Sequence, residues 1–148
     1  MKQTNQEQRG FTVMEVLVAL GLLAVLFAFT APIVANNYRR YQLTSEKQQV
    51  VTLLQKAREE AMSNVASRSH GFSVQSSTYV IFAGTSYAMR DFSMDQIYPR
   101  NTAISVTGTT EFVFSALVGT PVSSSLYLND PPLVASISIN GEGRIDYD

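Results

Sequence analysis

The first part of the chain is an apolar run that a single charge interrupts. Within residues 11–31, every residue is apolar, small or a hydroxyl residue except Glu15. A helix needs about 20 such residues to cross a bilayer, so residues 11–31 are predicted to be a transmembrane helix. A carboxylate inside such a helix costs roughly 2.5–3.5 kcal/mol on insertion scales. Glu15 is therefore predicted to be a functional residue that requires a partner.

Beyond this run, the pattern predicts an amphipathic continuation of the same helix over residues 32–70. Pro32 lacks an amide hydrogen, and we expect it to kink the helix rather than end it. Between residues 38 and 67, apolar residues recur at spacings of three, four and seven and so form one stripe. The stripe consists of Leu43, Val50, Leu54, Ala57, Ala61 and Val65, widened by Val51 and Met62. Gly71 is the expected terminator of this helix.

After Gly71 the pattern is typical of strands, and residues 71–148 are predicted to form a β-rich globular head. Residues 72–75 and 78–82 should form a hairpin, and further strands are expected at 103–107, 111–114, 126–128, 134–139 and 144–147. A turn at 140–143 joins the last two. In strand 134–139, Ala135, Ile137 and Ile139 alternate with serines, so one face should pack on the helical stripe. Residues 84–100 have no regular pattern.

These elements predict the α+β class, with a long N-terminal helix packed on an antiparallel β-sheet head. The formal net charge is −1, so the chain has no overall basic field for nucleic acid. It has no cysteine, which excludes a disulfide scaffold and thiolate chemistry. His70 is the only histidine and is interpreted as a solvated residue at the helix end.

A secretory signal peptide and a plain signal anchor are two alternatives for the N-terminal segment, and neither accounts for all of its features. A secretory signal peptide has an apolar region of about 7–15 residues and a small-residue cleavage site. Here the run is longer, Pro32 disfavours a cut after Ala31, and residues 33–35 offer only a weak site. A plain signal anchor accounts for the length of the run. It explains neither Glu15 nor the glycine, Gly10, directly before the run.

The segment Gly10-Phe11-Thr12-Val13-Met14-Glu15-Val16-Leu17 resembles the class III signal of type IV prepilins and pseudopilins. The resemblance implies that prepilin peptidase cuts between Gly10 and Phe11, which removes residues 1–10 as a cytoplasmic leader peptide. It also implies that Phe11 is then N-methylated and that Glu15 is the assembly residue. The Glu15 carboxylate would pair with the new amine of Phe11 on a neighbouring subunit. Snorkelling of Glu15 to the membrane interface is the alternative, but it leaves Gly10 and Phe11 unexplained.

Three further segments resemble the minor pseudopilin H and FimT-like branch of this family. Residues 56–61 resemble its alanine–arginine helix end, and residues 112–119 resemble its strand and turn from phenylalanine to glycine. Residues 137–145 resemble its closing glycine–arginine hairpin. The resemblance to the branch implies a pilin-like fold for the whole chain.

No catalytic motif is found, and the protein is not expected to be an enzyme or to use a cofactor or metal. Neither a Gly-x-Ser-x-Gly motif nor a phosphate-binding loop occurs. Asp91 and Asp95 lack the additional oxygen ligands of a calcium loop. The residues of a candidate ligand surface are Arg90, Arg100 and Arg144, with aromatic residues near the first two and acidic residues around the third.

The function that the resemblance implies is structural: a minor pilin or pseudopilin in a type IV pilus or type II secretion filament. Its partners would be prepilin peptidase, other pilins and the inner-membrane assembly platform. It would be a single-pass protein of the bacterial inner membrane, with its head in the periplasm or outside the cell. The alternative is a membrane-anchored binding module, such as a DNA-binding minor pilin for DNA uptake. The sequence leaves open which machine the protein serves.

Overall fold

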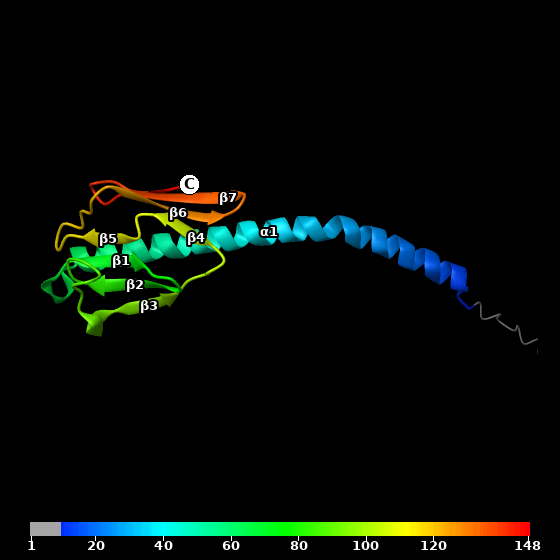
Figure 1. The fold of residues 1–148 in the computed structure, drawn as a ribbon, viewed down its shortest axis with the longest axis horizontal. Coiled ribbons are helices and arrows are strands. Elements are labelled where there is room, and N and C mark those ends of the chain that lie inside the picture. The colour runs from blue at the N-terminus through cyan, green and yellow to red at the C-terminus, as the bar shows by residue number, and fades with distance from the viewer. Residues whose placement is uncertain (1–9) are drawn as a thin grey trace, which may run out of the picture. The chain divides into compact units, whose positions relative to one another are not determined.

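The computed structural model describes residues 10–148, apart from the side chains of residues 29–35. The chain divides into two compact units, Met1–Tyr38 and Arg39–Asp148. Helix α1 (Val13–Met62) contributes residues to both units (Figure 1). Residues 1–9 of the expected leader peptide lie outside the described residues, as do the side chains of residues 29–31 at the end of the expected transmembrane segment.

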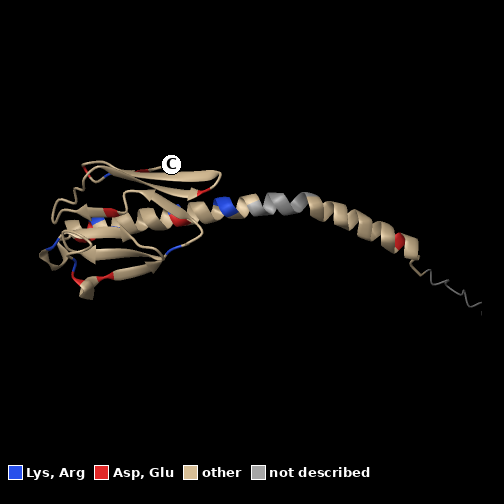
Figure 2. Cartoon of the chain, in the orientation of Figure 1, with Lys and Arg blue, Asp and Glu red and all other residues tan. Residues whose placement is uncertain are grey.

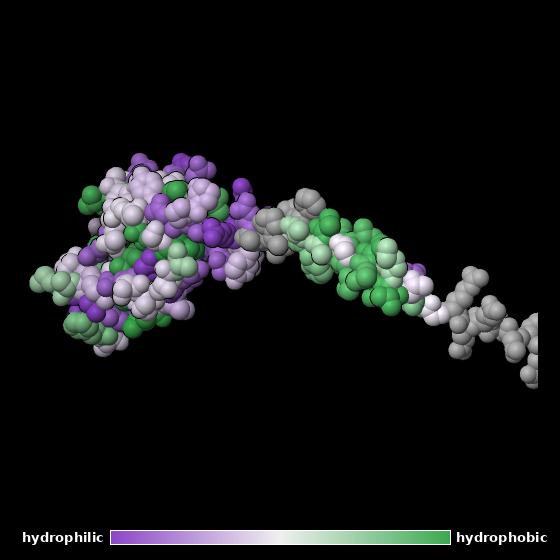
Figure 3. All heavy atoms as spheres, turned by 45° about the vertical axis from the view of Figure 1, so that its right-hand side comes forward, coloured by the Kyte–Doolittle hydropathy of each residue, from purple (hydrophilic) through white to green (hydrophobic). Residues whose placement is uncertain are grey.

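In the first unit, apolar side chains surround the helix on all sides. Every described side chain from Phe11 to Ala28 is exposed, and Figure 3 shows an almost wholly apolar surface there. Within the part of the chain that is described, no helix combines the length and the apolarity needed to cross a membrane.

As predicted, α1 does not end at Pro32. The kink expected at Pro32 stays a prediction.

The second unit is built around the amphipathic part of α1. The predicted stripe is confirmed at six positions, all at most 7% exposed: Leu43, Val50, Val51, Leu54, Ala57 and Ala61. Leu53, which is 4% exposed, also belongs to it and was not predicted. Met62 and Val65 are 46% and 39% exposed, so their assignment to the stripe was wrong.

Helix α1 ends at Met62, before the predicted boundary at residue 70. Asn64, Ala66 and Ser67 have φ angles of 52°, 53° and 56°, which lie in the left-handed region and cannot continue a right-handed helix. The chain instead forms a short 3-10 segment, η1 (Val65–Ser67). Strand β1 then begins at His70, so Gly71 is a strand residue and not the terminator of the helix.

Within the described residues, eight strands form two antiparallel sheets (Figure 1). The first sheet has the order β3-β2-β1-β5, with β1 (His70–Val74), β2 (Thr78–Ala83), β3 (Gln96–Pro99) and β5 (Glu111–Phe114). The second has the order β4-β6-β7-β8, with β4 (Ser105–Gly108), β6 (Ser124–Asp130), β7 (Leu133–Ile139) and β8 (Ile145–Tyr147). The predicted α+β class is confirmed. Strand β3 and the 3-10 segment η2 (Phe92–Met94) lie in the region where no pattern was found.

Both sheets pack on the stripe of α1 and share one hydrophobic core. The core residues of the first sheet include Phe72, Tyr79, Ile81, Phe112 and Phe114, and those of the second include Leu126, Leu128 and Ile137. The face predicted for β7 is confirmed, since Ala135, Ile137 and Ile139 are 5%, 0% and 2% exposed. Burial of this apolar surface is the main source of stability for the second unit.

The opposite face of the first sheet has its own buried aromatic residue, Phe82. In the β1–β2 register Phe82 lies opposite Gly71. A Cβ added at Gly71 would be 2.3 Å from the Phe82 ring and 2.7 Å from the Phe112 carbonyl oxygen. The Phe82 ring also contacts the Tyr87 ring edge to face, with centroids 5.7 Å apart. Gly71 is therefore required because an aromatic ring occupies the space of its side chain.

A buried carboxylate, which the sequence did not indicate, links α1 to the first sheet. Glu46 is 6% exposed, and its Oε1 accepts hydrogen bonds from the Tyr79 hydroxyl (2.7 Å) and the Asn101 amide (3.1 Å). A buried carboxylate is tolerated only when it is hydrogen bonded. These bonds fix the loop after β3 against the helix.

We expect Gly71→Ala to lower the free energy of unfolding by about 1–3 kcal/mol, because the new methyl group overlaps a buried ring and a backbone oxygen. Gly141→Ala is the matched control, since its nearest neighbour would be the Ser123 hydroxyl at 3.5 Å. Urea unfolding of the full chain in detergent measures both variants. Equal stability of the two variants would contradict this packing requirement at Gly71.

The stability of the second unit should also fall at alkaline pH. Burial, together with the hydrogen bond to Glu46, raises the pKa of Tyr79. The Tyr79 hydroxyl ionises near pH 10 in the unfolded chain, whereas it stays protonated at that pH in the folded chain. The free energy of unfolding is therefore at its full value below about pH 10 and falls above it by about 1.4 kcal/mol per pH unit. Urea unfolding at several pH values measures the free energy of unfolding as a function of pH. Above about pH 10, this free energy should fall less steeply with pH in Tyr79→Phe than in the wild type. The exposed control Tyr41→Phe should keep the wild-type slope, and identical slopes in all three proteins would contradict the assignment.

Candidate processing and assembly site

The start of α1 is fixed by a hydrogen bond between two residues of the predicted signal. The Thr12 Oγ1 accepts from the Glu15 amide at 3.2 Å, and the Thr12 carbonyl accepts from the Val16 amide at 3.2 Å. Thr12 is thus the N-cap of the helix, and Glu15 is the third residue within it. A carboxylate in the first turn is also favoured by the helix dipole. The structure therefore places Glu15 one turn from Phe11.

Four residues, Gly10, Phe11, Thr12 and Glu15, line a hollow of about 510 Å³. Phe11 is 83% exposed, and Gly10 is also exposed. A Cβ added at Gly10 would have no described heavy atom within 4 Å. Packing among the described residues therefore gives no reason for a glycine at position 10.

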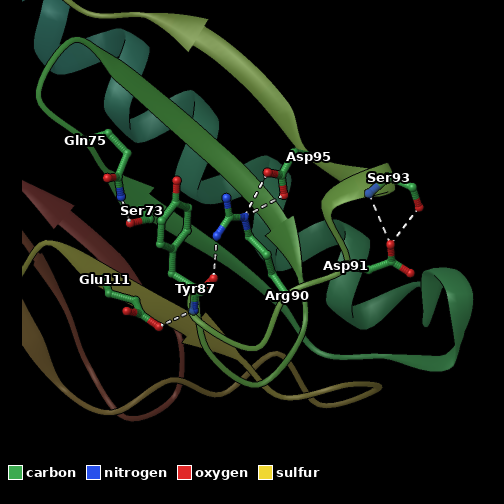
Figure 4. A network of polar contacts seen from close by, with 8 residues as sticks. All are labelled: Ser73, Gln75, Tyr87, Arg90, Asp91, Ser93, Asp95 and Glu111. Atoms are coloured by element: carbon green, nitrogen blue, oxygen red, sulfur yellow. Dashed lines mark hydrogen bonds and ion pairs between the residues drawn. The ribbon is translucent and has the colours of Figure 1, made fainter.

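The three arginines of the candidate ligand surface do not lie together. Arg90 and Arg100 flank the two ends of β3, and Arg144 precedes β8 in the other sheet. The Arg90 guanidinium lies 3.7 Å from the Tyr87 ring centroid and 4.2 Å from that of Phe92. It also pairs with Asp95 at 2.8 Å, as Figure 4 shows. Arg90 therefore stabilises its own loop and is not free to bind an anion.

Arg100 and Arg144 are also engaged within the chain. Arg100 donates to the carbonyl oxygens of Gln75, Ser76 and Ile104, at distances from 2.7 to 3.2 Å. Arg144 pairs with Asp146 at 2.9 Å on an exposed surface. The described structure thus does not bring together a basic surface from these three residues.

Asp91 and Asp95 are likewise occupied by partners other than a cation. Asp91 accepts from the hydroxyl and amide of Ser93, which together lower the pKa of its carboxyl group, and it pairs with Arg68 at 3.1 Å. Figure 4 shows the Ser93 bonds. Among the described residues, no group of three histidine, cysteine or acidic side chains could hold a metal ion.

His70 was predicted to be solvated, and this was wrong, because it is a residue of β1 that is 2% exposed. Its Nδ1 lies 3.2 Å from the Arg68 carbonyl oxygen, and its Nε2 lies 4.0 Å from Glu60 Oε2. The early end of α1 explains this burial, since the chain has already entered the sheet at residue 70.

The structure joins the three segments that resemble the pseudopilin H branch. The Arg58 Nε is 3.4 Å from the Gly119 carbonyl oxygen, and its Nη2 is 3.3 Å from the Glu142 carbonyl oxygen. Gly143 has a φ of 80°, and a Cβ there would be 2.5 Å from the Gly119 oxygen and 2.7 Å from the Arg58 Nε. The three segments could be recognised from the sequence, but nothing in the sequence indicated that Arg58 would connect them.

Comparison with known proteins identifies the N-terminal segment. Residues 5–31 match the prokaryotic N-terminal methylation motif. No curated protein and no solved structure matches the chain significantly. The motif supports a type IV pilin-like precursor, implies processing by prepilin peptidase and assembly with other pilins, and favours a structural over a catalytic protein.

Proposed function

We propose that this protein is a structural subunit, a minor pilin or pseudopilin, of a type IV pilus or type II secretion filament. It is made as a precursor, is cut between Gly10 and Phe11, and is N-methylated at Phe11. The observation that carries the proposal is the position of Glu15, one turn after the cut and within the matched methylation motif. The subunit assembles through its N-terminal helix.

The charge of Glu15 provides the free energy that favours assembly. Glu15 is the only charged residue between positions 11 and 38, and Figure 2 shows one acidic position at the start of α1. After the cut, the Phe11 amine of one subunit pairs with the Glu15 carboxylate of another. In lipid an unpaired carboxylate is unfavourable by roughly 2.5–3.5 kcal/mol, so pairing favours the filament over the single subunit.

The partners in this proposal are prepilin peptidase, other pilins and the inner-membrane assembly platform. The protein lies in the bacterial inner membrane, crosses it once through residues 11–31, and carries its head in the periplasm or outside the cell. The contacts of Arg58 support membership of the pseudopilin H and FimT-like branch, because they connect all three segments of the resemblance. A DNA-binding role receives less support, since Arg90 and Arg100 bind within the chain.

Replacement of Glu15 tests the assembly role. We expect Glu15→Leu to insert into the membrane normally and to enter filaments at least about tenfold less than wild type, because the pairing charge is lost. The control Asp146→Asn removes an exposed acid of the head and should assemble normally. Filament fractions compared by immunoblotting measure the effect. Normal incorporation of Glu15→Leu would refute the pairing mechanism.

Replacement of Gly10 tests the processing site. We expect Gly10→Val to remain uncut, whereas wild type loses residues 1–10 and gains a methyl group on Phe11, as mass spectrometry would show. The control Gly21→Ala also lies in open space on α1 and should be processed normally. A mature N-terminus at any residue other than Phe11 would overturn the class III assignment.

A further inference from the structure

Arg40 differs from the other described arginines in having no partner within the chain. Arg39 donates to the Pro131 carbonyl oxygen at 3.5 Å. A carboxylate or carbonyl oxygen also engages each of the remaining five, which are Arg58, Arg68, Arg90, Arg100 and Arg144. Among the described residues, no hydrogen bond or ion pair engages the exposed Arg40 guanidinium. Its charge is therefore free to bind a molecule outside the chain.

Arg40 lines a hollow of about 360 Å³ between α1 and β7, here called the α1–β7 hollow. This volume lies within the range of small-molecule sites, about 300–1,000 Å³. One side of the lining is polar and the other is apolar: Arg40, Thr44 and Lys47 come from α1, and Leu133 and Val134 come from β7. A ligand that matches this lining has a polar and an apolar part.

The polar side of the hollow is suited to a phosphate group. Arg40, Thr44 and Lys47 are spaced four and three residues apart, so they lie on one face of α1. The Lys47 ammonium lies 5.5 Å from the centroid of the Tyr147 ring. Two cations and a hydroxyl group can all donate to phosphate oxygens, and bonds between ions are the stronger kind. Asp148 is the single acidic side chain in the lining, so the positive charge there is in excess.

The position of Arg40 in the sequence brings the hollow close to a membrane surface. Residues 32–35 continue the apolar run, and Arg40 follows Ala35 by five residues, or about 7.5 Å of helix. The headgroup layer on each side of a bilayer is about 5–7 Å thick. Tyr38 and Tyr41, which are 61% and 73% exposed, flank the two arginines, and tyrosine is enriched at membrane interfaces. Figure 2 shows basic residues on this part of α1.

We propose that the α1–β7 hollow binds the headgroup of an anionic phospholipid in the leaflet from which the head emerges. Arg40, Thr44 and Lys47 bind the phosphate, and Leu133 and Val134 contact the glycerol and the first acyl carbons. A soluble anion would leave this apolar side unused, whereas a lipid fills both sides. The inference rests on the proposed function, in which residues 11–31 cross the membrane, and it adds a lipid ligand for the head.

Native mass spectrometry of the full chain in detergent tests the site, with equal amounts of phosphatidylglycerol and phosphatidylcholine added. Both lipids carry the same acyl chains, so contacts of the apolar helix favour neither. Wild type should retain phosphatidylglycerol in preference. Arg40→Gln/Lys47→Gln should reduce this preference at least about fivefold, since each cation near an anionic membrane surface contributes roughly that factor.

The matched control removes the same charge elsewhere in the head. Arg68→Gln/Arg144→Gln changes side chains that are 52% and 73% exposed and should keep the preference for phosphatidylglycerol. An equal loss of preference in this control would show a general charge effect and would overturn the site.

Two further variants separate charge from shape within the hollow. Arg40→Lys/Lys47→Arg retains both charges and should retain the preference. Val134 is 61% exposed, so Val134→Asp should fold normally while it places an acid in the hollow and removes the preference. A preference that survives Val134→Asp would contradict binding in the hollow.

Inorganic phosphate tests whether the ligand has to be a lipid. An excess of inorganic phosphate should leave phosphatidylglycerol bound, because the apolar contacts and the membrane helix hold the lipid at the site. Displacement of phosphatidylglycerol would assign the hollow to a soluble anion and would overturn the lipid assignment.

Flotation of the full chain on vesicles of the same two lipids separates this inference from the proposed function. A chain that floats with vesicles but shows no preference for phosphatidylglycerol overturns the lipid site and leaves the function standing. A chain that floats with neither kind of vesicle would contradict the membrane segment on which the proposed function depends.

Discussion

Burial of the apolar stripe of α1 against two sheets is the interaction on which the second unit depends. Each sheet supplies aromatic or branched side chains to one common core, and without the helix the core-facing side of each sheet would be uncovered. The contacts that define the ends of the unit follow from this packing. Arg58, on the same helix, can join the turns at Gly119 and Gly143 only because the core holds both sheets beside it.

Two carboxylates of α1 show how one helix uses charge in different surroundings. Glu46 is buried in the head, and its bonds to Tyr79 and Asn101 lie within the chain, so its role is to position a loop. Glu15 is in the first turn of an apolar helix, where its backbone amide donates to the Thr12 hydroxyl and its side chain is exposed. In the filament that we propose, the partner of Glu15 comes from another subunit.

Much of the fold could be predicted from the sequence, because the signals involved are local. The period of the α1 stripe and the alternation in β7 depend on neighbouring residues alone, and the buried positions agree with both. The end of α1 was misplaced because the left-handed residues Asn64 and Ala66 are not glycines and gave no signal. Strand β3 was missed since its stability comes from contacts with β2 and α1, such as the bond from Lys56 to Tyr98.

The sequence by itself determined the N-terminal methylation motif, the isolated position of Glu15 and the α+β class, because each is a pattern of adjacent or periodic residues. Only the tertiary structure decided which charged residues are available to partners. From the sequence, Arg90 and Arg100 were candidates for a ligand surface, and the structure shows instead that aromatic, carboxylate and carbonyl partners within the chain engage them. Such partners come from distant positions in the chain, and their geometry exists only after the core has formed.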